Sequence, residues 1–287
     1  MSFAQTVVLG ALAGFTIYLG LPVGRLQLLG SRPRVALAMF SVGVLAFIFV
    51  DVLSGAIEIA NSTLDGVKHH HQSMAYLVWL VVLLGGGFAA GSAGLAMIER
   101  QLRPLGRRTP PIAGAADATA LSVSEADAMA LELDAARRRA LRTGLTIAAA
   151  IGVHNFAEGL AIGVSARAGA ISLATVLIIG FALHNATEGF GIVGPLGDVR
   201  PSWRWLGLAG LIGGGPTFLG SIVGYAVTSD PLELAFYAVA GGAILYVIGE
   251  VWNGMRRYGH RELGLLMVTA GFMIGVITDL IVTYGGA

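Results

Sequence analysis

Long apolar runs alternate with short polar breaks along most of the chain. Each run is about 20 residues long, which is the length that an α-helix needs to cross the hydrocarbon core of a bilayer. We therefore predict an all-α polytopic membrane protein with eight transmembrane helices in one bundle. The eight predicted spans are 4–23, 36–60, 75–98, 143–166, 171–195, 203–227, 233–252 and 263–284.

One polar stretch, residues 99–142, separates the third run from the fourth. Its content of Ala, Asp, Ser, Pro and Arg favours a largely flexible loop, with a short helix around 122–140. The chain is thus predicted to hold helices one to three in 1–98 and helices four to eight in 143–287. Together they form a single membrane domain.

Positive charge is distributed unevenly between the connections. Those after the odd-numbered spans hold 16 of the 18 Lys and Arg residues, and those after the even-numbered spans hold only Lys68 and Arg167. Cytoplasmic loops are enriched in Lys and Arg, so this asymmetry predicts that loop 99–142 is cytoplasmic and that both termini lie outside. The first run has no positive charge before it and is long enough to span, which favours a membrane helix over a cleaved signal peptide.

Composition supports a lipid environment. Charged residues make up 12% of the chain and the mean hydropathy is +0.77, whereas soluble proteins contain about 25% charged residues. A net charge of +1 gives no reason to expect a nucleic-acid partner, and the absence of cysteine excludes disulfides, thiolate metal ligands and a thiol nucleophile. The 42 glycines fit close packing of membrane helices.

The fourth and fifth spans carry the same polar motif, His-Asn-x-x-Glu-Gly, in two copies 30 residues apart. His and Glu four positions apart share one helix face. The short connection at 167–170 makes the two helices antiparallel neighbours, so their polar faces can meet at the same depth. The six candidate ligands are His154, Asn155 and Glu158 in the first copy and His184, Asn185 and Glu188 in the second.

Charged groups in the middle of a bilayer cost several kcal/mol unless they share a partner. A divalent cation supplies one, and imidazole nitrogen with carboxylate oxygen suits zinc and its neighbours in the first transition row. Hydrogen bonding between helices is the plainer interpretation, but two matched copies favour a metal site. Histidine binds metal in its neutral form, so we expect mild acid to weaken binding.

At this repeated motif the chain resembles the ZIP (Zrt-, Irt-like protein) family of metal transporters, and its bacterial GufA-like members in particular. The resemblance implies a ZIP-like bundle in a bacterial cytoplasmic (inner) membrane, and a transporter rather than an enzyme. It implies that the six motif residues bind the transported ion and carry it into the cytoplasm. Zn²⁺ is the expected substrate, with Fe²⁺, Mn²⁺, Cd²⁺ and Co²⁺ left open. The expected partners are this ion, the lipid bilayer and, since the family often dimerises, a second copy of the chain.

The chain departs from the family pattern in places. Many members carry Glu-Pro in the sixth span, where this chain has Gly215-Pro216, and some carry Asp in place of Asn185. With fewer carboxylates, one principal ion is favoured over two. The histidine-rich stretch that is usual in the long loop is missing from 99–142. Pro216 still predicts a kink with freed carbonyl groups.

Three acidic residues outside the motif are candidates for the metal pathway. Asp51 and Glu58 lie seven positions apart and share a face of the second span. Glu250 lies near the cytoplasmic end of the seventh span, where it either lines the path or pairs with Arg256 or Arg257.

Two further polar features lie near the predicted outer surface. The run His69, His70 and His71 between the second and third spans either captures metal at the entrance or is an ordinary solvated loop. Asp279 in the eighth span belongs to no motif, and we expect it at the membrane interface near the outer end.

Two other functions stay open at this point. An intramembrane zinc-dependent hydrolase would use the histidines as ligands and a glutamate as base, although the zincin pattern His-Glu-x-x-His is absent. A metal-sensing membrane protein would bind the ion without net flux. A doubled donor set favours transport over an enzyme site with three ligands and one open position.

Overall fold

The structure, a computed structural model, describes residues 1–26, 30–102, 123–167, 169, 171–226 and 229–286, and the regular elements in these ranges are all helical. Its elements are α1 (Phe3–Phe15), α2 (Ile17–Gly20), η1 (Leu21–Arg25), α3 (Ser31–Lys68), α4 (Met74–Ala89), η2 (Ala90–Gly94), α5 (Leu95–Leu102), α6 (Val123–Arg167), α7 (Ile171–Val193), η3 (Gly194–Leu196), α8 (Trp203–Ala226), α9 (Asp230–Arg256) and α10 (Arg261–Gly286).

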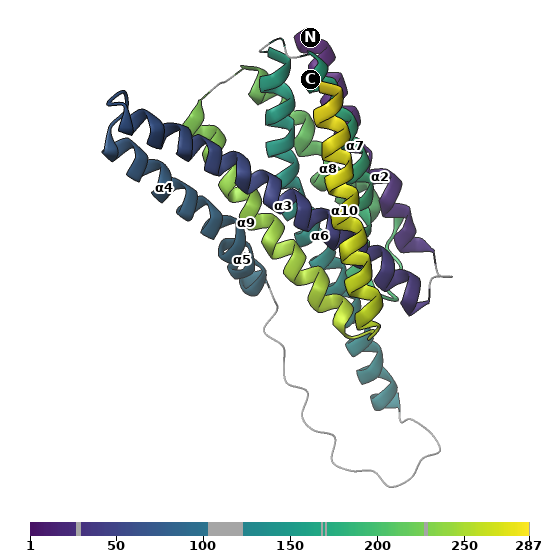
Figure 1. The fold of residues 1–287 in the computed structure, drawn as a ribbon. Helices are drawn as coiled ribbons and strands as arrows, with labels where there is room; N and C mark the ends of the chain where they lie inside the picture. Colours follow the sequence, from purple (N-terminus) through teal and green to yellow (C-terminus); the bar gives the residue numbers. More distant parts are fainter. Residues whose placement is uncertain (27–29, 103–122, 168, 170, 227–228, 287) are drawn as a thin grey trace.

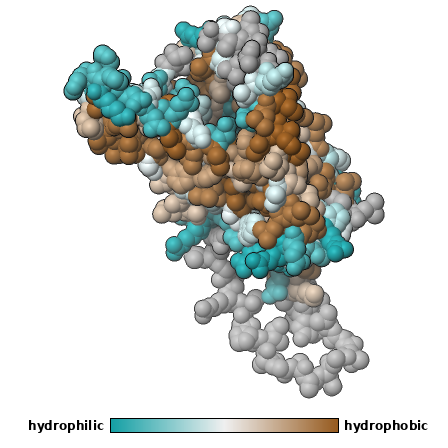
Figure 2. Space-filling model, viewed as in Figure 1, coloured by the Kyte–Doolittle hydropathy of each residue, from teal (hydrophilic) through white to brown (hydrophobic). Residues whose placement is uncertain are grey.

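The predicted fold class is confirmed. Among the described residues, seven helices are long and apolar enough to cross a membrane, and the 23-residue α7 packs among them. The first span is α1, α2 and η1 in succession, and the third is α4, a π-helical turn (η2) and α5. In Figure 2 the surface is mostly apolar around the middle of the bundle and hydrophilic towards its ends.

The polar stretch 99–142 is only partly a connection. The helix expected around 122–140 is present, but it is the first part of α6, which runs without a break from Val123 into the fourth span. On the other side of the loop, α5 extends to Leu102. The remaining residues of the predicted loop, 103–122, lie outside the described residues.

The two ends of the bundle differ in what they carry. Both chain termini and the turn between α3 and α4 lie at one end, which we call the termini end (Figure 1). The end of α5, the start of α6 and the turn between α9 and α10 lie at the other, which we call the α5–α6 end. This arrangement agrees with the even number of spans expected from the sequence.

Glycines join the helices into two groups. In the first group, a Cβ atom on Gly159 of α6 would lie 2.2 Å from the carbonyl oxygen of Thr217 in α8. In the second, a Cβ atom on Gly43 of α3 would lie 2.1 Å from the carbonyl oxygen of Val268 in α10. Similar backbone contacts join α1 to α8 and α2 to α7 in the first group, and α4 to α9 in the second, whereas α9 meets α3 through side chains.

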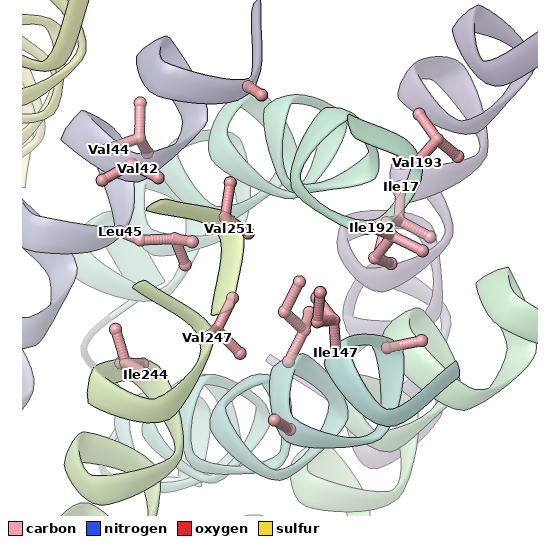
Figure 3. Close-up of a cluster of buried hydrophobic side chains, with 14 of the residues drawn as sticks. Ile17, Val42, Val44, Leu45, Ile147, Ile192, Val193, Ile244, Val247 and Val251 are labelled. Carbon is pink, nitrogen blue, oxygen red and sulfur yellow. The ribbon is translucent and has the colours of Figure 1, made fainter. Parts of the chain in front are cut away.

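Larger apolar side chains fill the space between these two groups (Figure 3). Leu45 of α3 and Val247 of α9 belong to the same buried cluster as Ile147 of α6 and Ile192 of α7, and each of the four is fully buried. The main hydrophobic core therefore lies at the boundary between the groups, where side chains and not backbones meet.

Candidate metal site

The two copies of the motif meet inside the bundle. The Nε2 atom of His154 lies 3.0 Å from Glu158 Oε1 and 3.7 Å from Glu188 Oε1. The Nε2 atom of His184, on the other helix, contacts the same Glu158 oxygen. The donor atoms of His154, Glu158 and His184 all lie within 4.8 Å of one another. Both imidazoles thus converge on one carboxylate oxygen, with a second carboxylate close by.

These polar groups are removed from solvent and lack ordinary partners. Glu158 is 4% exposed and Glu188 is 0% exposed. Among the described residues, His154 Nδ1, Glu158 Oε2 and Glu188 Oε1 form no hydrogen bond. A buried polar atom without a partner costs about 1–3 kcal/mol, and more when it is charged. A cation bound between the two helices would relieve this cost.

The asparagines of the motif donate hydrogen bonds to backbone carbonyl groups of other helices, close to a proline or a helix break. Asn155 donates from Nδ2 to the carbonyl oxygen of Gly213 at 2.9 Å, in the turn of α8 that precedes Pro216, and to Glu188 Oε2 at 3.2 Å. Asn185 donates to the carbonyl oxygen of Ala13 at 3.2 Å, beside the break between α1 and α2. Both amide oxygens are buried without hydrogen-bond partners among the described residues, so they remain available to a cation.

The glycine that ends each motif copy sets how closely the helices approach. A Cβ atom on Gly159 would collide with the backbone of α8, and one on Gly189 would lie 2.7 Å from the carbonyl oxygen of Ile17 in α2. Because these glycines follow Glu158 and Glu188 directly, the close contacts fix the backbone at the positions that carry the carboxylates.

A cavity of about 320 Å³ leads to this cluster. It is lined from α3, α6, α7, α9 and α10, and its buried side contains His154, Glu158 and the largely buried His184. Asp51 and Glu58 of α3 also line it and are exposed. Because α3 runs from the α5–α6 end to the termini end, Glu58 lies nearer to the termini end than Asp51 does. The acidic lining of the cavity therefore extends towards the termini end.

The structure adds a cavity to the expectation for Asp279. This residue lines the cavity from the later part of α10 and lies close enough to Asp51 to interact with it electrostatically, while its position at the membrane interface stays a prediction. A lone carboxylate inside an apolar span was the signal that could have identified it. Tyr237 of α9 lines the same cavity and donates its hydroxyl to Glu233 at 3.0 Å, which no motif predicted.

Two other groups of candidates are not brought to the cavity. Glu250 lies in α9 and is not among the residues that line it, while Arg257 donates to the carbonyl oxygen of Pro195 at 3.2 Å. The run His69, His70 and His71 is exposed at the turn between α3 and α4, away from the cluster. Their roles in the pathway stay predictions.

Comparison with known proteins identifies the family of the chain. Residues 127–277, just over half of the chain and including both motif copies, match the family profile described as "ZIP Zinc transporter". The chain belongs to the ZIP family of zinc transporters. Its members are transporters and not enzymes, so the hydrolase alternative is set aside.

Two bacterial zinc transporters are similar to this ZIP family member. The zinc transporter ZupT of Clostridium perfringens is 29% identical over 150 residues, which cover 49% of this chain and 51% of that protein. The zinc transporter ZupT of Corynebacterium aurimucosum is 24% identical over 289 residues, which cover 97% of this chain and 96% of that protein. The first match spans about half of its relative, and the second spans nearly all.

On the side of the site opposite the cavity, this ZIP family member is closed by apolar side chains. Ile147 and Ile151 precede His154 on α6, and Ile192 follows Glu188 on α7. All three are almost completely buried in the cluster between the two helix groups. The candidate metal site thus borders the cavity on one side and buried apolar side chains on the side towards the α5–α6 end.

Proposed function

We propose that this protein carries Zn²⁺ into the cytoplasm through the cavity and the histidine–glutamate site between α6 and α7. The observation that carries the proposal is the convergence of His154 and His184 on Glu158, with Glu188 beside them. Two imidazoles and a carboxylate form the donor set that zinc prefers in proteins. Family membership and the two related zinc transporters support zinc as the substrate.

The proposed direction follows from charge and from the shape of the cavity. The excess of Lys and Arg in the connections at the α5–α6 end supports a cytoplasmic location for that end. The cavity then opens to the outside, where Asp51, Glu58 and Asp279 raise the local concentration of cations at its mouth. An ion would lose water as it moves from these carboxylates to the buried histidines.

Release into the cytoplasm requires that the apolar seal opens. The two helix groups meet through side chains, while close backbone contacts at glycines join pairs of helices within each group. We propose that the group of α1, α6, α7 and α8, which carries the motif, moves against the group of α3, α4, α9 and α10. Such a movement would keep the ligands together and expose them on the other side.

Uptake of ⁶⁵Zn²⁺ into proteoliposomes tests this function. We expect Glu158→Gln and His184→Ala to lower the initial rate about 100-fold, because each removes a proposed ligand and even partners outside the ligand set change metal affinity by about 10- to 100-fold. Glu262→Gln, which removes a carboxylate at the start of α10 and outside the cavity, is the matched control and should transport normally. Transport by the first two variants at the parental rate, with equal protein per liposome, would disprove the site.

The same assay separates transport from sensing and ranks the metals. Net flux excludes a sensor that only binds the ion. The nitrogen-containing donor set predicts that Cd²⁺ and Co²⁺ compete with zinc, while Mg²⁺ and Ca²⁺, which prefer oxygen ligands alone, do not. Inhibition by millimolar Mg²⁺ at constant ionic strength would contradict the proposed ligands.

A further inference from the structure

A second cavity, of about 410 Å³, lies between α3, α9 and α10 at the α5–α6 end of the bundle. It does not share any lining residue with the metal-site cavity. Its volume lies within the range that proteins use to bind small ligands. It is lined by Val35, Met39, Trp252, Met255, Arg256, Gly259, His260, Arg261, Gly264 and Leu265.

One side of this cavity is basic. Arg256 ends α9 and Arg261 begins α10, and both are exposed. Neither forms an ion pair with any of the described residues, and the cavity lining includes no acidic side chain. His260 lies between them in sequence and its Nε2 atom is 3.0 Å from the hydroxyl of Ser31, which links the start of α10 to the start of α3. The basic rim is therefore available to an anion.

The other side of the cavity is apolar and continues onto the lipid-facing surface. Val35 and Met39 of α3 are buried at its base, while Trp252 and Leu265 are 36% and 45% exposed beside it. In Figure 2 the surface changes from apolar to hydrophilic at the end of the bundle where Figure 1 places the turn between α9 and α10. Trp at such a boundary is typical of the interface between hydrocarbon and headgroups.

We infer that this cavity binds an anionic phospholipid, with the phosphate between Arg256 and Arg261 and the first part of an acyl chain against Trp252 and Leu265. Basic pockets between membrane helices are suited to acidic headgroups. The positive end of the α10 helix dipole lies at the same place and favours a negative charge. Glu262 in the first turn of α10 is exposed and lies outside the lining, so it does not occupy the rim.

A lipid suits this cavity better than a free phosphate ion does. A small anion needs only the basic rim, and would leave the apolar base and the exposed Trp252 and Leu265 unused. A phospholipid uses both sides of the cavity. Its headgroup would lie at the basic rim, and its acyl chain would extend from there along the apolar wall towards the middle of the bundle.

Lipid titration of the purified full-length protein in detergent, followed by native mass spectrometry, tests this inference. Dioleoyl-phosphatidylglycerol is the probe, and dioleoyl-phosphatidylcholine and inorganic phosphate are the comparisons. We expect phosphatidylglycerol to be retained in preference to both. The double variant R256Q/R261Q should weaken its binding about 30-fold, since each basic residue near an anionic headgroup contributes roughly a factor of five.

A matched pair of arginines controls for general surface charge. R137Q/R139Q removes the same charge from exposed positions of α6 that lie outside the cavity, and should change phosphatidylglycerol binding by less than about twofold. A third variant, Gly264→Met, keeps both arginines and fills the cavity. A Cβ atom there makes only an ordinary contact, 3.5 Å from Met39 Cγ, so folding should be preserved and lipid binding lost.

Three outcomes would overturn the inference. Equal retention of phosphatidylcholine would show that the basic rim does not select the headgroup. Inorganic phosphate that binds as tightly as phosphatidylglycerol would identify an ion site without a role for the acyl chain. Equal weakening by R137Q/R139Q would assign the effect to diffuse charge. Thermal unfolding of each variant without added lipid separates these outcomes from a loss of folding.

Discussion

At the scale of single residues, the two copies of the motif differ in role although their sequences match. Glu158 lies between both imidazoles, whereas Glu188 is held by the side-chain amide of Asn155. Asn185 bonds to a backbone carbonyl of another helix. The sequence repeat is thus not a structural repeat. Glu158 contacts both imidazoles, and Glu188 is oriented by a hydrogen bond from Asn155. The number of bound ions stays a prediction.

Asn155→Ala should weaken zinc binding without removing a histidine or a carboxylate. The substitution leaves Glu188 without its orienting amide and removes the side-chain hydrogen bond to the carbonyl oxygen of Gly213. We expect a 10- to 100-fold higher dissociation constant for zinc, about the usual loss for a partner of a metal ligand. Isothermal titration of the purified protein measures it, with Asn253→Ala, an exposed asparagine on α9 outside the cavity, as the control. Unchanged affinity would contradict the positioning role.

The carboxylates at the cavity mouth should raise the rate at which zinc enters the cavity, without contributing ligands to the histidine–glutamate site. Asp51→Asn with Asp279→Asn removes two negative charges from the lining. We expect zinc uptake at low zinc concentration to fall about tenfold at low ionic strength and to recover in part at high salt, because the effect of exposed charges is screened. Liposome uptake across a salt series checks this. A salt-independent loss would show that these residues are direct ligands.

At the scale of helices, glycine replaces the hydrophobic effect as the basis of specific packing. Lipid chains are as apolar as leucine, so membrane helices associate by close backbone approach and by polar contacts. Here the glycines of the metal motif belong to that packing, since Gly159 contacts α8 and Gly189 contacts α2. The candidate metal ligands and the glycines that fix the helices are therefore adjacent in the same short motif.

Gly159→Ala tests how much the close contact between α6 and α8 contributes to stability. Its added Cβ atom would lie 2.2 Å from the backbone of α8, and we expect a loss of about 1–3 kcal/mol in stability from overpacking. Gly207→Ala in α8, where a Cβ atom meets nothing within 4 Å, is the matched control. It should be neutral or slightly stabilising, since alanine is the better helix former. Thermal unfolding in detergent compares the two, and equal stability would mean that α6 and α8 can move apart freely.

At the scale of the whole molecule, the structure has one open side and one closed side. The cavity reaches the candidate metal site from one side, and buried apolar side chains fill the space between the two helix groups on its other side. Access to the site from one side at a time is what a carrier requires. The natural absence of cysteine makes this organisation directly testable by chemical labelling.

Two serine-to-cysteine variants on α3 should report the open and the closed side. Ser54 lines the cavity and is exposed, while Ser41, 13 residues earlier, is completely buried beside Gly191 of α7. We expect Ser54→Cys to react with a membrane-impermeant maleimide from outside intact cells, and zinc to slow the reaction. Ser41→Cys should react only from the cytoplasmic side and only during transport. Labelling of Ser41→Cys from outside would contradict the proposed orientation or the seal.

The sequence by itself determined the fold class and identified the six motif residues as candidate ligands. A hydrophobic span and a repeated His–Asn–Glu motif are local patterns, so both can be recognised without knowing which helices are neighbours. The sequence also placed Asp51 and Glu58 on one face of a helix by their spacing, and the structure places both in the cavity lining.

Only the tertiary structure decided which of these groups meet. Packing placed Asp279 beside Asp51, left Glu250 outside the cavity, and gave Asn155 and Asn185 partners on α8 and α1. The second cavity, between α3, α9 and α10, was likewise invisible in the sequence. The physical reason is that these contacts join residues far apart in the chain, and their distances depend on how closely glycine lets the helices approach.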